Sequence, residues 1–84
     1  MDLVKTVSRI EEKVEIEIPN EALENFTTPQ IIIDYLHNLP KFQNLNRPRE
    51  YLADKIWLII EDEAGIERKD FNENSRLIED MGMG

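Results

Sequence analysis

The spacing of the apolar residues near the start of the sequence most restricts what this chain can fold into. Within residues 2–14, each member of one apolar series stands three or four positions from the next: Leu3, Val7, Ile10 and Val14. This interval places side chains on one face of an α-helix. Polar or charged residues occupy most of the positions between them, so only this face suits burial. The spacing therefore predicts an amphipathic helix over residues 2–14.

Two shorter helical segments are predicted after this helix. Residues 20–26 suit one or two helical turns, with Asn20 as the N-cap. The next segment, 27–36, starts at Thr27 and has Gln30 three residues later, which is the spacing of a capping box. Its isoleucines and leucine recur at helical intervals, so we expect this segment to be a helix as well.

The longest helix is predicted over about 48–64, because a proline suits its first turn and Gly65 suits a left-handed C-cap. Residues 37–47 contain three asparagines and show no sustained period, so we predict a linker there. After Gly65 we expect a long loop with a short helical turn at 76–81. Four helical segments in 84 residues predict a single all-α domain over 1–84, built as a four-helix bundle.

The charge balance and the composition argue against several classes of function. The sequence has 18 acidic and 10 basic residues and a formal net charge of −8, whereas nucleic-acid binding requires a surplus of Lys and Arg on some face. No cysteine is present, so disulfides and thiolate chemistry are excluded. No apolar run reaches membrane-spanning length, and no signal-peptide pattern opens the sequence. We expect a cytoplasmic protein that inserts into no membrane and that suits basic protein partners.

The residue types that carry catalysis or bind metals form no convincing group. His37 is the only histidine, and a single histidine at a helix end is weak support for a catalytic base. The acidic run 61–63 lacks the spaced oxygen ligands and the glycine of a calcium loop. Ser8 and Ser75 are the only serines, and neither stands in a nucleophile elbow. The sequence therefore predicts no catalytic residue, no metal site and no enzyme activity of its own.

A resemblance to a known family emerges when the two parts of the sequence are read in the opposite order. With residues 48–84 placed before 1–36, the stretch LIEDMG (77–82) is similar to the F-x-x-D-L-G segment of acyl carrier proteins. EIPNE (17–21) resembles the E-I-P-D-E loop of that family, and FTTPQIIIDYL (26–36) resembles its I-T-T-V-x-x-x-x-D-Y-I helix. The chain thus resembles a circularly permuted acyl carrier protein, with the family's helices in the order 2-3-4-linker-1-loop.

The resemblance also implies a position for a cofactor. Family members carry 4′-phosphopantetheine on a serine at the start of the second helix, where helix N–H groups favour a phosphate. Joining the two ends of this sequence puts that position between Met83-Gly84 and Met1-Asp2, but no serine is present there. We therefore expect no cofactor on the chain as written. An engineered permutation, a natural degenerate carrier and an omitted modified serine all remain open.

The family's partners imply roles for further residues. By resemblance, the domain would carry acyl groups as thioesters for fatty-acid, lipid or polyketide-type synthesis, and a phosphopantetheinyl transferase would load it. The helix that contacts the acyl-synthesis enzymes would present Asp2, Lys5, Arg9, Glu11 and Glu12. A candidate acyl pocket would be lined by apolar core residues: Val7, Ile10, Ile18, Ile32, Tyr35, Ile56 and Ile59.

A function of another class stays open beside this one. A non-carrier scaffold or interaction domain, either engineered or degenerate, would keep the fold and lack the attachment serine. We expect a monomer. The alternative is a swapped dimer in which the helix over 48–64 docks on a second chain.

Overall fold

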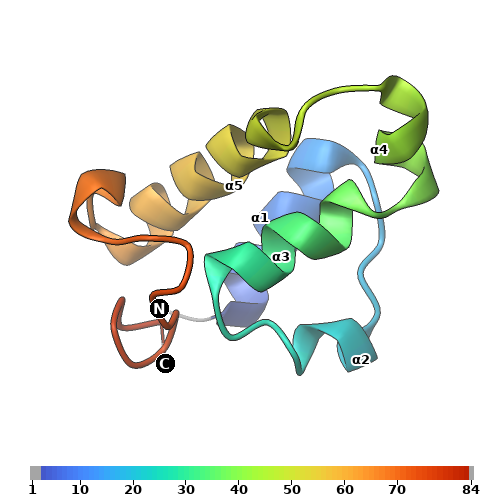
Figure 1. Cartoon of the computed structure of the whole chain (residues 1–84). Coiled ribbons are helices and arrows are strands. Elements are labelled where there is room, and N and C mark those ends of the chain that lie inside the picture. Colours follow the sequence, from blue (N-terminus) through green and yellow to red (C-terminus); the bar gives the residue numbers. More distant parts are fainter. Residues whose placement is uncertain (1–2, 84) are drawn as a thin grey trace.

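The structure is a computed structural model that describes residues 3–83, and within this range the chain is helical and has no β-strand (Figure 1). The elements, in chain order, are α1 (Leu3–Val14), α2 (Asn20–Leu23), α3 (Pro29–His37), α4 (Pro40–Leu45), α5 (Arg49–Ala64) and a 3₁₀ turn, η1 (Arg68–Asp70). The predicted all-α class is confirmed. No helix in the described range combines the length and the apolar character needed to cross a bilayer.

The long helix α5 packs against both α1 and α3, and α4 packs against α3 (Figure 1). A helix with two packing partners must bury a wide face, and α5 does so with six residues: Leu52, Ala53, Ile56, Trp57, Ile59 and Ile60. Trp57 is 2% exposed, so it widens the core face of α5 and does not form a surface patch. The hydrophobic core of the domain therefore lies around α5.

The predicted stripe of α1 forms the buried face of that helix. Val7, Ile10 and Val14 are buried, while Leu3 is half-buried and packs against the core. The helix ends where Glu15 adopts a left-handed backbone conformation, with φ of 55°. The chain then turns, and the Glu11 carboxylate accepts a hydrogen bond from the amide of Ile18 at 2.7 Å. This bond fixes the extended segment that leads to α2.

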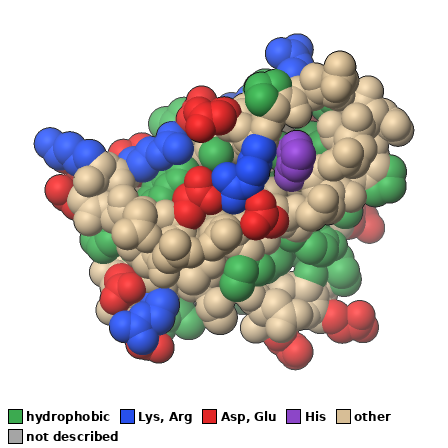
Figure 2. Space-filling view, viewed as in Figure 1, with side chains coloured by type: hydrophobic (Ala, Val, Ile, Leu, Met, Phe, Trp, Pro, Cys, Tyr) green, Lys and Arg blue, Asp and Glu red, His purple; other side chains and the backbone are tan. Residues whose placement is uncertain are grey.

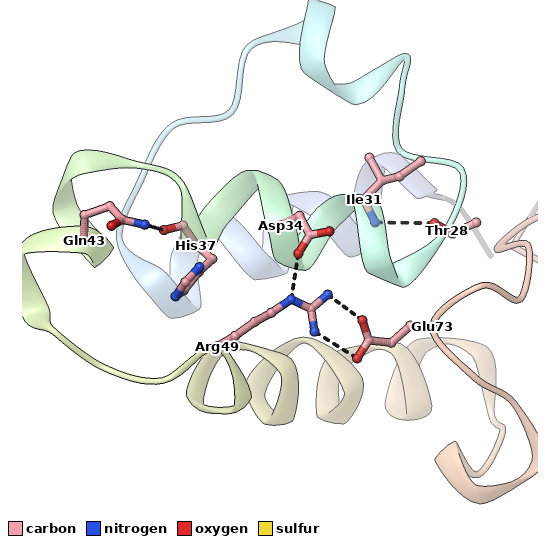
Figure 3. A network of polar contacts seen from close by, with 7 residues as sticks. All are labelled: Thr28, Ile31, Asp34, His37, Gln43, Arg49 and Glu73. Atoms are coloured by element: carbon pink, nitrogen blue, oxygen red, sulfur yellow. Dashed lines mark hydrogen bonds and ion pairs between the residues drawn. The ribbon is translucent and has the colours of Figure 1, made fainter.

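The starts of α2, α3 and α5 each differ by one residue from the prediction, and a proline lies at each of them. Helix α2 begins one residue earlier, at the predicted cap Asn20, whereas α3 and α5 begin one residue later. Thr28, not Thr27, is the N-cap of α3, and its hydroxyl accepts a hydrogen bond from the Ile31 amide at 3.4 Å (Figure 3). Proline has no N–H group and disfavours helical geometry in the residue before it, so Pro29 becomes the first helical residue and its predecessor the cap. At α2 and α5 the N-cap positions are occupied by prolines themselves, Pro19 and Pro48.

The predicted linker contains a helix, α4, which the sequence analysis did not anticipate. Phe42 is buried and anchors α4 to the core, and the helix ends at Asn46, whose φ is 54°. The Lys41 ammonium donates to the carbonyl oxygens of Val14 and Glu15, at 2.7 and 3.0 Å. These carbonyls lie at the end of α1, where helical partners are lacking and a cation is favourable. A single buried aromatic residue gives no period, which is why this helix escaped prediction.

The segment after α5 is mainly a loop, as predicted, but it contains the 3₁₀ turn η1, which was not predicted. Gly65 is the left-handed C-cap of α5, with φ of 68°, and its amide donates to the Glu61 carbonyl at 2.9 Å. The predicted turn at 76–81 is a hydrogen-bonded turn in which the Asp80 amide donates to the Arg76 carbonyl at 2.9 Å. It buries the side chains of Leu77, Met81 and Met83. These apolar side chains thus pack the turn against the core.

Replacing Asp80 with asparagine is expected to weaken this turn in a pH-dependent way. The Asp80 carboxylate accepts a hydrogen bond from the Arg76 amide at 2.7 Å. This bond, and then the Arg76 guanidinium, hold the pKa of Asp80 below its ordinary value of 3.8. A carboxyl whose pKa is lowered by folding stabilises the fold above its ordinary pKa and loses that contribution as the pH falls through the folded value.

The measurement for Asp80→Asn is the free energy of unfolding in urea between about pH 7 and about pH 2. We expect the wild-type protein to be the more stable one near neutral pH and the difference to disappear at the acidic end. A difference of the same size at every pH would contradict the role given to the Asp80 charge.

Candidate functional site

The predicted attachment position lies where the last turn of the chain approaches the start of α1. In Figure 1 the last turn and the beginning of α1 lie toward the same end of the molecule. Three of the four predicted flanking residues, Met1, Asp2 and Gly84, lie outside the described residues. The fourth, Met83, is 1% exposed, and its amide donates to the Leu77 carbonyl at 3.0 Å. The end of the described chain is therefore packed against the core at Met83.

A surface hollow of about 370 Å³ lies between the start of α3 and the turn at 76–82. It is lined by Thr27, Thr28, Arg76, Ile78 and Glu79. Ile78 is 54% exposed and is its only large apolar side chain. None of these residues belongs to the predicted acyl pocket. The sequence offered no signal for this hollow, because its lining residues come from two segments that are about fifty positions apart in the chain.

The seven residues of the candidate acyl pocket lie in or against the packed core. Six of them are buried, and Tyr35 is half-buried with its ring edge-on to Phe26 at 5.4 Å between ring centroids. Ile59 also borders shallow hollows on the surface beside Arg9 and Lys13. The seven positions are thus brought together as core residues, and the space between them is occupied by side chains.

The predicted partner helix α1 uses one of its charged residues to hold α5. The Arg9 guanidinium donates to the carboxylates of Asp62 and Glu63, at 2.6 and 2.8 Å. These hydrogen bonds, first the one with Glu63, raise the pKa of Arg9. The Glu63 side chain is only 9% exposed, and pairing with Arg9 explains how an acid is accommodated on the core side of α5.

The remaining four residues of the predicted partner helix differ in their surroundings. Glu11 binds the Ile18 amide and is therefore occupied within the molecule. Lys5 and Glu12 are exposed on α1 and remain the accessible charges of the predicted face, while Asp2 lies outside the described residues. Two residues of the predicted docking helix, Arg9 and Glu11, therefore make contacts within the molecule.

A polar network that the sequence analysis missed joins α3, α5 and the loop after η1 (Figure 3). The Arg49 side chain donates to Asp34 at 2.6 Å and makes two hydrogen bonds with Glu73. These bonds, those with Glu73 first, raise the pKa of Arg49. The Glu73 carbonyl also accepts a hydrogen bond from the Gln30 amide at 3.0 Å. The loop is therefore attached to two helices at one position, by both side chain and backbone.

The residues considered for catalysis show structural roles or stand apart. The carbonyl of His37 accepts a hydrogen bond from the Gln43 side chain at 2.6 Å (Figure 3). The Ser75 hydroxyl accepts a hydrogen bond from the Asn72 amide at 3.1 Å, so it closes a turn, and Ser8 is exposed on α1. Among the described residues, no three or more His, Asp or Glu side chains gather in a way that would hold a metal ion.

Comparison with known proteins does not assign this chain to a family. No family model matches the sequence, and no solved structure matches the chain significantly. The resemblance to acyl carrier proteins therefore rests on the three sequence segments and enters the next subsection as a proposal.

Proposed function

We propose that this domain is an acyl-carrier-type module with a circularly permuted chain. In the proposed ancestral order, α5 comes first, the segment 65–83 follows, and α1, α2 and α3 complete the domain. The observation that carries the proposal is the packing of α5 against both α1 and α3. This packing makes α5 the central helix of the three. The same arrangement of helices could therefore form from a chain that is opened at a different position.

The two connections that a permutation requires are compatible with the arrangement of the helices. One connection replaces the ancestral chain ends and must lead from the end of α3 to the start of α5. Residues 38–48, which include α4, make this connection. They lie beside the end of α3 and the start of α5 (Figure 1). The other is the ancestral link from the last turn to the start of α1, at one end of the molecule. Chains tolerate such rearrangements where old ends are close and new ends are accessible.

The proposed attachment position has a suitable chemical environment. A helix of 12 residues, α1, begins at Leu3, shortly after this position in the sequence, and the unpaired N–H groups and dipole at a helix start favour a phosphodiester. The hollow beside Ile78 lies next to the same turn and offers a partly apolar surface on which a short acyl chain could rest. The domain would present the group to other enzymes and would catalyse no step itself.

The test restores the serine and reverses the permutation. In this variant Gly84 is joined to Met1 through one serine, and the chain is opened within 38–47. After incubation with coenzyme A and a broad-specificity phosphopantetheinyl transferase, we expect the intact mass to rise by roughly 340 Da, the mass of one phosphopantetheine group. The matched control carries alanine in place of the inserted serine and should show no gain.

A folded serine variant that gains no mass would contradict the carrier proposal. Circular dichroism of both variants shows whether they are folded, so a failure to load is distinguished from a failure to fold. The original chain, with its helices in the present order and no added serine, is measured in parallel. A mass gain on that chain would point to Ser8 or Ser75, and it would contradict the position proposed here while keeping the chemistry.

The second candidate is a non-carrier scaffold or interaction domain. Two observations favour it: the seven predicted pocket residues are packed together as core, and Arg9 and Glu11 are occupied within the molecule. A domain of this kind would keep this core and would bind its partners through exposed residues. It becomes the better account if the restored serine is not modified in a folded protein.

A further inference from the structure

A second cavity lies between α5 and the segment that contains η1. It shares no lining residue with the hollow near the proposed attachment position. Its volume is about 500 Å³, and it is lined by Trp57, Arg68, Lys69, Phe71, Asn72 and Glu73. Sites for small molecules in proteins have volumes of about 300–1,000 Å³ and combine apolar walls with a few polar groups. Here two aromatic side chains supply the apolar walls, so the cavity has the composition of a ligand site.

The Trp57 side chain, which belongs to the lining of this cavity, has an unpaired hydrogen-bond donor. An indole N–H can only donate a hydrogen bond. Trp57 is 2% exposed, and its indole nitrogen is buried with no hydrogen-bond partner among the described residues. Buried donors are nearly always paired in folded proteins, and an unpaired one calls for an explanation such as an acceptor from outside the chain. A ligand with an acceptor atom would supply it.

The charged groups around the cavity favour an acceptor that is negatively charged. The Arg68 guanidinium lies over the Trp57 ring, 5.5 Å from the ring centroid, and Lys69 adds a second cation. The acidic residue of the lining, Glu73, is already bound by Arg49 through two hydrogen bonds, which compensate its charge. In Figure 2, blue side chains lie beside hydrophobic ones at the end of the molecule where Figure 1 shows the turn after α5.

The two cations are held loosely enough to change partners. Arg68 pairs with Asp54 at 2.9 Å, with side chains that are 41% and 63% exposed. Lys69 pairs with Glu67 at 3.1 Å, and both of these side chains are still more exposed. Exposed ion pairs contribute little to stability. The indole nitrogen is shielded, so binding of an acceptor to it would require a side chain beside Trp57 to move, and Arg68 lies over the Trp57 ring.

We propose that this cavity binds a planar aromatic carboxylate. The carboxylate would accept a hydrogen bond from the Trp57 indole and replace Asp54 as the partner of Arg68, while the ring of the ligand would lie against Phe71. A carboxylate fits better than a free phosphate, because two walls of the cavity are aromatic and one of its donors is a single neutral N–H group. This inference does not depend on the carrier proposal.

The single tryptophan provides a direct measurement. Because the sequence contains one tryptophan, a ¹⁵N-labelled sample gives one indole N–H signal in a heteronuclear NMR spectrum, and that signal reports on Trp57 alone. We expect a saturable shift of this signal when benzoate is added, and a much weaker response to benzyl alcohol, which has the ring but no charge. The absence of a saturable shift with benzoate would overturn the proposal, and an equal response to benzyl alcohol would overturn the role of the carboxylate.

Two substitutions at the cavity should change the benzoate affinity in opposite directions. Arg68→Gln removes the partner of the carboxylate and should weaken binding by about twofold to fivefold, as expected for a partly exposed ion pair. Asp54→Asn frees Arg68 and removes a competing carboxylate, so it should strengthen binding by a similar factor. Both variants keep Trp57 and hence the same signal.

The matched controls change the charge by the same amount away from the cavity. Arg47→Gln is the control for Arg68→Gln, and Asp62→Asn, which is also on α5, is the control for Asp54→Asn. We expect both controls to bind benzoate as the wild type does. If each control changes the affinity as much as its partner, the effect comes from net charge, and the assignment of Arg68 is wrong.

Discussion

Replacing Ile56 with alanine should lower the free energy of unfolding by about 2–5 kcal/mol. Ile56 is fully buried in α5, the helix that packs against both α1 and α3. Its removal leaves a cavity at the point where the three helices meet the core, and the surrounding helices can close it only in part. A domain of this size has a total stability of only about 5–15 kcal/mol, so the loss would be a large fraction of the whole.

The measurement is urea denaturation followed by circular dichroism, with Leu58→Ala as the matched control. Leu58 is in the same helix but is 66% exposed, so its replacement should change the free energy of unfolding by no more than about 0.5 kcal/mol. The gain in helix propensity on going to alanine is below about 0.7 kcal/mol at either position, which is small beside the expected loss at Ile56. Equal losses at the two positions would mean that α5 does not have the central place in the core described above.

Replacing Arg49 with methionine should destabilise the domain by about 1–2 kcal/mol and loosen the loop that carries Glu73. Hydrogen bonds with charged groups contribute about 1.5–3 kcal/mol, and the lower figure allows for solvent screening, since the Arg49 side chain is 33% exposed. The variant leaves Asp34 and Glu73 without their cation. Methionine keeps much of the apolar stem, so the loss reports mainly on the charged contacts.

Amide hydrogen exchange distinguishes local loosening from a general loss of stability. The Gln30 amide donates to the Glu73 carbonyl, and the Leu77 amide donates to the Thr27 carbonyl. Both should exchange faster in the Arg49→Met variant than the loss of global stability explains. Lys69→Met is the control, because the Lys69 side chain is 77% exposed and pairs only at the surface. Unchanged protection of Gln30 would show that the backbone alone holds the loop.

The helices with a sustained apolar period were the predictable part of this fold. The stripe of α1 follows from spacing alone, and Gly65 ends the long helix α5 as expected. Cap positions were predicted less well, because Pro29 shifted the start of α3 by one residue and moved the cap to Thr28. The helix α4 was missed because it rests on one buried residue, Phe42, and on contacts of Lys41 with α1.

The candidate sites depend on contacts between distant segments, which no local pattern contains. The pairing of Arg49 with Asp34 and Glu73 joins residues that are 15 and 24 positions apart. Arg9 was predicted as a partner-binding residue, and its use in holding α5 becomes visible only when the two helices are in place. The unpaired indole of Trp57 is likewise a tertiary property, since the sequence indicates only that Trp57 borders an apolar stripe.

The order of the helices along the chain has a consequence for how the domain assembles. Helices α3 and α5 are separated by residues 38–48, whereas α1 and α5 are separated by 15–48. Closing the longer segment costs about 1 kcal/mol more in chain entropy, so we expect α3 and α5 to meet early and α1 to join late. Folding-rate analysis of substitutions at Ile32 and Ile10 would reveal this sequence of events. A chain opened within 38–47, as in the serine variant, would make α1 an early packing partner of α5. The position of the chain ends therefore influences the order in which the helices assemble, as well as their order in the sequence.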